Sequence, residues 1–422
     1  MAKSKCGSDA AVRGAGHPET MSGNRPVVLF CGGLAADGVA RNTVHLANAL
    51  ARRGVAVEVI CLEGGALARE LRGPSLTCLG RGRGPRGLSL AVAVAALRAR
   101  IVTLDPAVAV SMGNHAHLPL WAALRARPDI PRIYRISNDP AHDGRRGLRG
   151  LLRHAGLGLI AGDATRLVCV SQALSRLGAF RRARRDGRVV SLANGVDVAR
   201  VRASAGRPTA HSWAVDARPY LVAVGRVHPQ KNYGALIRAL ARLHASGRPD
   251  LRLLILGKAP AAHTAPLRRL ARELGVASAV RFEGETADPF PIVARAAAFV
   301  LPSLWEGASN SLLEALACGA PVVAGAGAGN AAEVLGQGRF GRLADARDPD
   351  ALADAIGLQL DPRHRVLPGG RAETFDLEAV LDRMCAIVLG ARSAHDEIQI
   401  RTEGARQPPP LSDPLRGPNT EF

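Results

Sequence analysis

The chain has 422 residues, 47% of them hydrophobic, which is enough for two ordinary hydrophobic cores. No apolar run approaches the roughly 18–20 residues that a membrane-spanning helix needs, and the first residues lack the apolar core of a signal peptide, so we expect a cytoplasmic protein. The net charge of +20 is concentrated in residues 1–205, which hold 31 Lys and Arg against 13 Asp and Glu; such a field attracts nucleic acid, anionic lipid or anionic substrates, although genomic base composition explains the same excess of Arg.

Seven cysteines are scattered through the chain without any C-x-x-C pair. Most of them lie within apolar runs that are typical of strands and helices. An odd number without paired spacing does not indicate a disulfide framework. We therefore predict reduced core thiols, with no disulfide and no metal site.

The N-terminal half alternates strand-like and helix-like patterns. The apolar run VVLFCGG begins at Val27, a Gly/Asp loop leads to Gly38, and a helical pattern continues to Arg53. Such alternation predicts a mostly parallel, doubly wound α/β sheet. The further predicted strands are Val55–Leu62, Leu76–Leu79, Ala107–Met112, Arg132–Ile136, Arg166–Val170 and Val189–Ala193. The further predicted helices are Leu88–Val102, His117–Arg127, Arg146–Ile160 and Gln172–Arg182.

The C-terminal half repeats this plan, so we expect two Rossmann-like domains that face each other across a cleft. Its predicted strands are Tyr220–Val224, Leu251–Leu256, Ala279–Phe282, Ala298–Leu301, Pro321–Val323 and Gly341–Leu343. Its predicted helices are Tyr233–Ser246, Pro266–Leu274, Phe290–Ala296, Ser311–Ala317, Ala331–Leu335 and Pro349–Ile356.

The composition between the two halves marks a domain boundary. Residues 203–219 are rich in Ser, Ala, Arg and Pro without periodicity, which predicts a linker at 206–219 between domains at 23–205 and 220–375. The tails at 1–22 and 393–422 are low in apolar content, so we predict that both are disordered. Met21 is a candidate for the first residue of the protein.

Two loops of the first domain carry candidate site residues. The loop that ends at Gly38 has neither a phosphate-loop motif nor a dinucleotide fingerprint, which argues against kinases and dehydrogenases. Gly38 either contacts substrate or only closes the strand on the helix. His115 and His117 follow a strand, but no further ligands complete a metal site, and helix capping is the alternative role for either.

A basic amphipathic segment lies at 144–160. Its arginines recur against leucines at helical spacing, as in helices that lie on anionic membranes. The alternative is a solvated helix that packs its leucines inward. We expect peripheral attachment to the inner face of the cytoplasmic membrane. The arginines are Arg145, Arg146, Arg149 and Arg153.

The segment LVAVGRVHPQKN at 221–232 predicts an anion site. A strand ends at Gly225, and the loop then presents Arg226 and Lys231 before the next helix begins. Arg grips phosphate oxygens with two N–H groups, Lys adds a point charge, and a helix N-terminus offers further N–H donors. This combination suits a pyrophosphate, and two surface charges on a loop are the alternative.

An acidic pair follows in LPSLWEGASNSLLEALACGAPVVAG at 301–325. Glu306 lies in the loop after a strand, and Glu314 lies in the first two turns of the next helix. Both therefore face the crevice where open α/β sheets bind ligands, and carboxylates there accept hydrogen bonds from sugar and ribose hydroxyls.

Glu306-x7-Glu314 followed by Ala-Cys-Gly-Ala-Pro-Val-Val resembles the signature of the family-4 retaining glycosyltransferases, which have the GT-B fold. The Gly-Arg and Lys-Asn pairs around Arg226 and Lys231 occur in that family as well. Asn194-Gly195-Val196-Asp197 resembles its closing motif of the first domain, which we interpret as architectural. Residues 376–392 resemble its terminal helix, which packs back on the first domain.

The resemblance implies a role for each site residue. Arg226 and Lys231 neutralise the diphosphate leaving group, and Glu306 approaches the donor sugar. The family wording Gly-Phe-Gly-x-Pro after the first Glu is replaced here by Gly-Ala-Ser-Asn-Ser at 307–311, which changes the sugar-facing pocket. The residues assigned to substrate binding are Gly38, His115, Asn310, Ser311, Glu314 and Glu333, with Glu314 at the ribose.

The implied reaction moves a sugar from a nucleoside diphosphate to an acceptor hydroxyl with retained configuration, without metal and without a cofactor other than this co-substrate. The expected acceptor is a lipid-linked or polysaccharide glycan. An enzyme of the nucleotide-sugar 2-epimerase type is the alternative in the same fold. A nucleic-acid-binding protein is a second alternative, but an aromatic content of 3% offers no stacking platform, so we expect no nucleic-acid partner.

Overall fold

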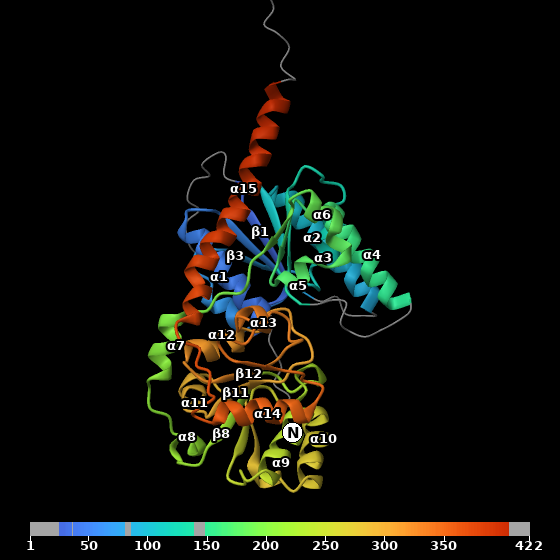
Figure 1. Ribbon diagram of the computed structural model, residues 1–422. Helices are drawn as coiled ribbons and strands as arrows, with labels where there is room; N and C mark the ends of the chain where they lie inside the picture. The colour runs from blue at the N-terminus through green and yellow to red at the C-terminus, as the bar shows by residue number, and fades with distance from the viewer. Residues whose placement is uncertain (1–24, 36, 81–85, 139–147, 405–422) are drawn as a thin grey trace, which may run out of the picture.

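The computed structural model describes residues 25–35, 37–80, 86–138 and 148–404, and it folds them into two α/β domains (Figure 1). Each domain is built on one parallel sheet with helices on both faces. The predicted fold class is therefore confirmed. The apolar strands form the sheets because burial on both faces of a parallel sheet requires near-continuous hydrophobic runs.

The N-terminal sheet has the strand order β3-β2-β1-β4-β5-β6-β7. Its central strands β1 and β4 pair in parallel, with Val27 opposite Val108. The strands are β1 Val27–Gly33, β2 Val57–Glu63, β3 Ser75–Cys78, β4 Val108–Ser111, β5 Arg132–Ile136, β6 Arg166–Cys169 and β7 Val189–Ser191.

Helices cover both faces of this sheet. One apolar cluster lies between β1, α1 and the terminal helix α15, and another lies between the opposite face and α2, α3, α4 and α6. The helices are α1 Gly38–Arg52, α2 Arg86–Leu104, α3 His117–Leu124, α4 Leu148–Asp163, α5 Gln172–Ser175, α6 Arg181–Arg185 and α15 Leu377–Gly404.

The helix predicted over 172–182 is broken. α5 ends at Ser175, a 3-10 turn covers Gly178–Phe180, and α6 begins at Arg181. Gly178 is a poor helix former, and the turn places Phe180, which is fully buried, in the core beside β6. Tertiary burial of one aromatic side chain therefore overrides the local helical pattern.

The C-terminal sheet has the order β10-β9-β8-β11-β12-β13. The observed bounds of β8 and β11 coincide with the predicted ones. The strands are β8 Tyr220–Val224, β9 Arg252–Leu256, β10 Val280–Gly284, β11 Ala298–Leu301, β12 Val322–Gly325 and β13 Arg342–Ala344.

The six helices predicted for the C-terminal domain are all present, and two further helices at 198–205 and 212–215 were not predicted. α10 begins at Ala261 rather than Pro266, so Pro266 lies inside the helix, where it removes one backbone hydrogen bond. The helices are α7 Val198–Ala205, α8 Ser212–Val215, α9 Tyr233–Ala245, α10 Ala261–Glu273, α11 Phe290–Ala294, α12 Asn310–Ala317, α13 Ala331–Val334 and α14 Pro349–Leu360.

The chain crosses between the domains twice, and the two crossings lie side by side. The Val196 N–H donates to the Phe375 carbonyl oxygen at 2.8 Å, and the Leu377 N–H donates to the Val196 carbonyl oxygen at 3.0 Å. The first crossing thus lies ahead of the predicted linker at 206–219. The domain boundary lies earlier than predicted because Val201 of α7 and Trp213 of α8 are buried in the core of the C-terminal domain, so both helices belong to that domain.

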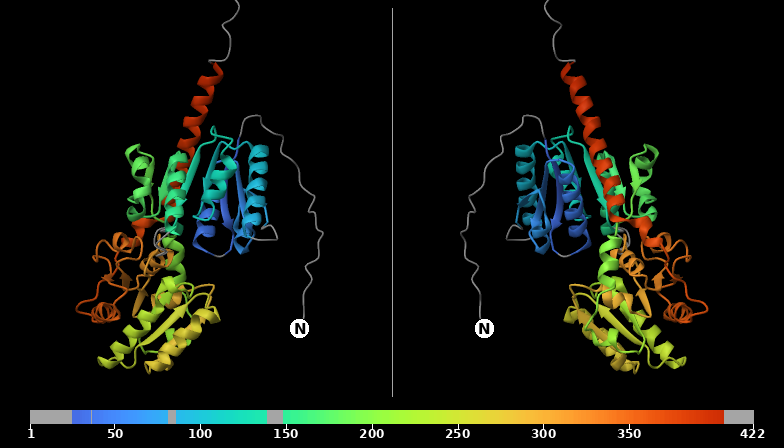
Figure 2. Two further views of the ribbon diagram at one scale, coloured as in Figure 1. Left: turned by 90° about the vertical axis from the view of Figure 1, so that its right-hand side faces the viewer. Right: turned by 90° about the vertical axis from the view of Figure 1, so that its left-hand side faces the viewer.

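α15 leaves the C-terminal domain and runs along the N-terminal domain, as the two side views show (Figure 2). Its side chains Leu381, Met384 and Val388 are buried in the same cluster as β1 and α1. The helix continues to Gly404, so residues 393–404 are helical, and the prediction of a disordered tail from residue 393 is wrong there. Residues 1–22 and 405–422 lie outside the described residues.

Candidate functional site

A cleft of about 550 Å³ lies between the two domains. The carboxyl ends of the central strands of both sheets open into it, which is where open α/β sheets bind ligands. Its walls combine charged and polar side chains from both domains. The lining residues include Gly38, Arg41, Asn138, Asn194, Arg226, Gln230, Lys231, Glu306, Asn310, Ser311 and Glu314.

Lys231 reaches the cleft from the loop after β8. The strand ends at Val224, and a short 3-10 turn at Pro229–Lys231 precedes α9. Gly225 has φ +154°, and a Cβ atom there would lie 2.9 Å from Lys231 Cε. Gly225 is therefore needed for two reasons, its backbone conformation and the close passage of the lysine side chain.

Lys231 and Glu306 form an ion pair in the cleft. Lys231 Nζ donates to Glu306 Oε1 at 2.6 Å, and the two side chains are 17% and 11% exposed. Ser303 Oγ also donates to Oε1, at 2.8 Å, and Gln230 Nε2 donates to Oε2 at 3.3 Å. Both carboxylate oxygens are thus occupied, and Glu306 holds the ammonium group at the cleft wall.

Arg226 presents a second positive charge to the same cleft. Its side chain is exposed, and within the described part of the chain its guanidinium makes no hydrogen bond or ion pair. Five N–H donors are therefore available to an anion. With Lys231 nearby along the same loop, the site supplies the two cations that the sequence predicts.

Glu314 projects into the cleft from α12. Burial raises the pKa of its carboxyl, while the positive charges of Arg200 and Arg41 act in the opposite direction. Ser309 and Ser311 pair through their hydroxyls at 3.0 Å, and no side chain caps the first turn of α12. No described side chain therefore occupies its first backbone N–H groups, and residues 309–311 at this end of the helix line the cleft.

Asn310 connects α12 to the N-terminal domain. Asn194 Nδ2 donates to Asn310 Oδ1 at 2.6 Å, and Arg135 Nη2 donates to Asn194 Oδ1 at 2.5 Å. A Cβ atom on Gly38 would lie 3.2 Å from Asn310 Nδ2. Residues 307–311, which differ from the Gly-Phe-Gly-x-Pro motif of the family, thus form part of the seam where the two domains touch.

Gly307 makes the closest approach in this seam. A Cβ atom on it would lie 2.6 Å from Asn138 Cα and nearer still to the Ser137 carbonyl oxygen, both of which belong to the N-terminal domain. Because those neighbours are backbone atoms, only glycine fits here without moving the domains apart.

Two of the predicted substrate residues lie away from the lining of this cleft. His115 is exposed and is not among the lining residues. Glu333 of α13 accepts a hydrogen bond from the Gln172 backbone N–H at 3.3 Å, so it contacts the first turn of α5 across the domain boundary. In this structure Glu333 is a contact between the domains.

His117 is a core residue. Its Nδ1 lies 2.6 Å from Ser111 Oγ, and burial, followed by the charge of His115, lowers its pKa to about 3. The described residues contain no group of three or more His, Cys, Asp or Glu side chains that could hold a metal ion. The cysteines among them carry free thiols.

Sequence reasoning missed the supporting residues Gln230, Ser303 and Arg135. Gln230 lies next to Lys231, and it donates to the Trp305 carbonyl oxygen at 2.8 Å as well as to Glu306. Its place between the predicted cations was a usable signal. The sequence around Arg135 contains no such signal, because a single Arg in a strand is expected at a sheet edge or in an ion pair.

Two family models match the chain, one in each domain. The model described as Glycosyltransferase Family 4 matches residues 36–200, and the model described as Glycosyl transferases group 1 matches residues 218–361. Together they include the cleft residues of both domains. The chain belongs to glycosyltransferase family 4.

The family-4 chain is 37% identical over 199 residues to the GDP-mannose-dependent alpha-(1-6)-phosphatidylinositol monomannoside mannosyltransferase of Mycolicibacterium smegmatis. The match covers 45% of this chain and 46% of the relative. The chain thus spans about half the length of that relative. It is 29% identical over 334 residues to the lipopolysaccharide core biosynthesis glycosyltransferase LpsE of Rhizobium meliloti, which covers 76% of this chain and 84% of LpsE.

Solved structures confirm the GT-B fold of the family-4 chain. The crystal structure of Anabaena HepE in complex with UDP has a TM-score of 0.70 at 18% identity, and the match covers 86% of this chain and 100% of HepE. WaaG, a glycosyltransferase involved in lipopolysaccharide biosynthesis, has a TM-score of 0.66 at 18% identity, with 86% of this chain and 100% of WaaG covered.

Proposed function

We propose that this protein is a retaining glycosyltransferase that moves a sugar from a nucleoside-diphosphate sugar to an acceptor hydroxyl. The observation that carries the proposal is the meeting of Arg226, the Lys231–Glu306 ion pair and Glu314 in one cleft between the domains of a family-4 chain. The relatives bear the names of transferases, so the epimerase alternative is not favoured.

The chemistry follows from the charges of the site. The bond between the anomeric carbon and the diphosphate oxygen breaks, and its electron pair goes to the diphosphate. Arg226, Lys231 and the N–H groups at the start of α12 stabilise this growing negative charge, an electrostatic effect that contributes about 3–4 kcal/mol per donor in comparable sites. The acceptor oxygen attacks from the same face and passes its proton to the departing phosphate oxygen.

The two carboxylates have different tasks in this proposal. Glu306 orients the Lys231 ammonium toward the diphosphate, since its oxygens already accept hydrogen bonds from Lys231, Ser303 and Gln230. The Glu314 carboxylate makes no hydrogen bond to any of the described residues, and burial disfavours its charge. Ribose hydroxyls that donate to Glu314 would restore the solvation that burial removes.

A donor screen with product analysis tests the function. Thermal unfolding is measured with UDP-, GDP-, ADP- and TDP-sugars, because a ligand at 100 times its dissociation constant stabilises the folded state by about 2.7 kcal/mol. The stabilising donor is then incubated with and without glycan acceptors. We expect an α-linked product from an α-linked donor and no altered free sugar. Sugar epimerised in the absence of any acceptor would contradict the proposal.

We expect transfer to be independent of divalent metal ions. Two fixed cations face the cleft, and the described residues contain no metal-binding cluster of His, Cys, Asp and Glu. Initial rates measured in EDTA and in excess Mg²⁺ or Mn²⁺ should agree within about twofold, since a Lewis acid would only duplicate the charges of Arg226 and Lys231. A strict requirement for either metal would remove these two residues from the proposed role.

The acceptor is proposed to be a lipid-linked or surface glycan on an anionic membrane. α4 exposes Leu151 at 66% and Leu152 at 62%, with Arg153 beside them, and it packs Leu157 and Ile160 inward. The interpretation in which the leucines pack inward is therefore wrong for Leu151 and Leu152. Arg145 and Arg146 lie outside the described residues. No described helix is both long and apolar enough to cross a membrane.

The double variant Leu151→Ser/Leu152→Ser tests this surface. Each leucine that enters a membrane contributes about 1.5–3 kcal/mol, so we expect affinity for anionic vesicles to fall at least about tenfold. Co-sedimentation at low and high salt is the measurement. Leu358→Ser, at an exposed leucine of α14, is the matched control and should bind as the wild type does. Wild-type protein that stays in the supernatant at low salt would indicate a soluble acceptor.

A further inference from the structure

Arg135 occupies an interior position of the N-terminal domain. In β5, Tyr134 and Ile136 face the cluster on the α3 and α4 side, so the alternation of the strand turns Ile133 and Arg135 toward α1 and α15. Arg135 is only 6% exposed. A full positive charge thus lies where the neighbouring layer consists of apolar side chains such as Met112 and Met384.

Two other buried arginines show what is unusual about Arg135. Arg132 forms an ion pair with Asp163, and Arg252 forms one with Asp216 at 3.0 Å. Arg135 makes only one hydrogen bond in the described part of the chain, to the neutral Asn194 amide oxygen. Burial alone lowers its pKa to about 10, with no carboxylate contributing. Burying an uncompensated charge is costly, so a counter-charge is expected.

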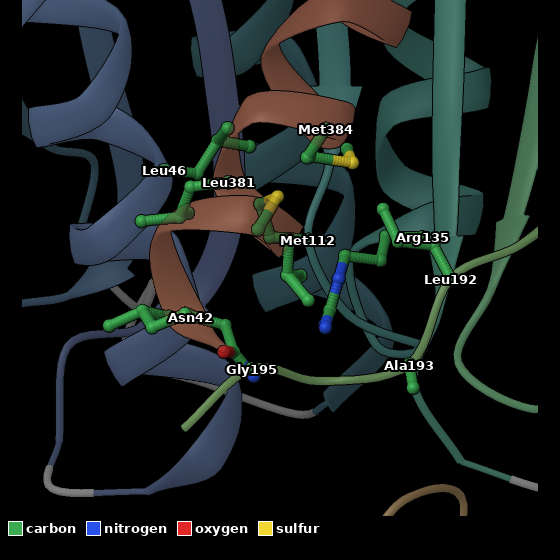
Figure 3. Close-up of a pocket in the computed structure, with 11 residues that line it drawn as sticks. Asn42, Leu46, Met112, Arg135, Leu192, Ala193, Gly195, Leu381 and Met384 are labelled. Carbon is green, nitrogen blue, oxygen red and sulfur yellow. The ribbon is translucent and has the colours of Figure 1, made fainter. Parts of the chain in front are cut away.

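A small cavity adjoins this guanidinium. It measures about 20 Å³, and Figure 3 shows Arg135 extending into the space among the lining side chains. One water-sized body needs about 10–15 Å³ measured in this way, so the volume suits a single small ion. Asn42 is the other polar side chain of the lining, and its amide makes no hydrogen bond within the described residues. The remaining walls are apolar.

We propose that this cavity binds one small monovalent anion of the size of chloride, held by the Arg135 guanidinium and the Asn42 amide. A guanidinium is weakly hydrated and binds anions through several N–H donors, and an amide NH₂ adds another donor. Phosphate and other polyvalent anions are too large for the volume, and apolar walls do not replace their hydration.

The cavity lies beside the two segments in which the chain crosses between the domains. Leu192, Ala193 and Gly195 of the first crossing line it, together with Leu377 and Leu381 at the start of α15. Arg135 Nη2 donates a hydrogen bond to Asn194 Oδ1, and Asn194 Nδ2 in turn donates to Asn310 Oδ1 of α12. The bound anion therefore stabilises the arrangement of the two domains seen here, and chloride should raise the temperature of unfolding.

The test compares the unfolding temperature of two variants with that of the wild type. The concentration of sodium chloride is raised from about 5 to about 500 mM, and sodium gluconate is lowered by the same amount so that the ionic strength stays constant. The gluconate anion is too large for the cavity. We expect chloride to raise the unfolding temperature of the wild type by about 3 °C or more. Arg135→Met should lose this dependence. Arg269→Met, which removes the same charge from an exposed position on α10, should keep it.

A second measurement does not depend on any variant. Crystals of the wild-type protein soaked in bromide should show an anomalous peak beside Arg135 and Asn42. If Arg135→Met fails to fold, Arg135→Lys retains a cation and should keep a weaker chloride response. A wild-type protein without bromide at this position, or with equal stability in chloride and gluconate, would overturn the proposal and leave water as the partner of Arg135.

Discussion

Replacing Lys231 by alanine should lower the turnover number by ~10²-fold or more, because the variant loses a fixed cation where the diphosphate gains charge. The change also leaves Glu306 as an unpaired negative charge at the wall of the cleft, since Lys231 is its ion-pair partner at 2.6 Å. That charge repels the donor and adds to the loss. Initial rates at saturating donor separate the effect on turnover from the effect on donor binding.

Lys258→Ala is the matched control for this prediction. Lys258 lies in the same domain, in the loop after β9, and its side chain is exposed and outside the cleft lining. Its removal should leave the rate within about twofold, as expected for a surface charge. An unchanged rate in Lys231→Ala would show that the ammonium group has no part in the reaction.

The double variant Lys231→Ala/Glu306→Gln separates two explanations of the loss. If the lysine only neutralises Glu306, removing both charges should restore most of the activity. If the lysine stabilises the diphosphate, the double variant should remain about as slow as Lys231→Ala. The proposed function requires the second result.

Gly307→Ala should lower kcat/KM by ~10²-fold, since misplacing reacting groups by about 1 Å has effects of that size. The added methyl group would meet backbone atoms of Ser137 and Asn138, which cannot rotate away as a side chain can. The domains must then separate at this seam. Donor binding should be retained in large part, because Arg226, Lys231 and Glu314 all belong to the C-terminal domain.

Gly327→Ala is the control for a glycine in the same domain. A Cβ atom there would lie 3.5 Å from the Leu304 carbonyl oxygen, an ordinary van der Waals distance. Its activity should match that of the wild type. Small-angle scattering with bound nucleotide should show a larger radius of gyration for Gly307→Ala than for this control. Full activity in Gly307→Ala would mean that the seam opens during the reaction without consequence.

Local patterns in the sequence were sufficient to predict most of the elements. β8 and β11 have the predicted bounds, because short apolar runs bounded by turn residues have few other ways to be buried. The predicted helix over 172–182 was wrong because burial of Phe180 in the tertiary structure outweighed helical periodicity. Cleft residues such as Arg226 and Glu314 were predictable because the ends of parallel strands meet at one edge of a sheet.

The sequence by itself determined the two-domain α/β plan, the family and the residue types that face the cleft, since these depend on periodicity and on short motifs. Only the tertiary structure decided which groups pair. Lys231 and Glu306 are 75 positions apart, and Asn194 and Asn310 are 116 positions apart. It also decided that Arg135 is buried without a carboxylate, while Arg132 of the same strand has one. The physical reason is that burial and charge pairing depend on neighbours in space, and those neighbours come from distant parts of the chain.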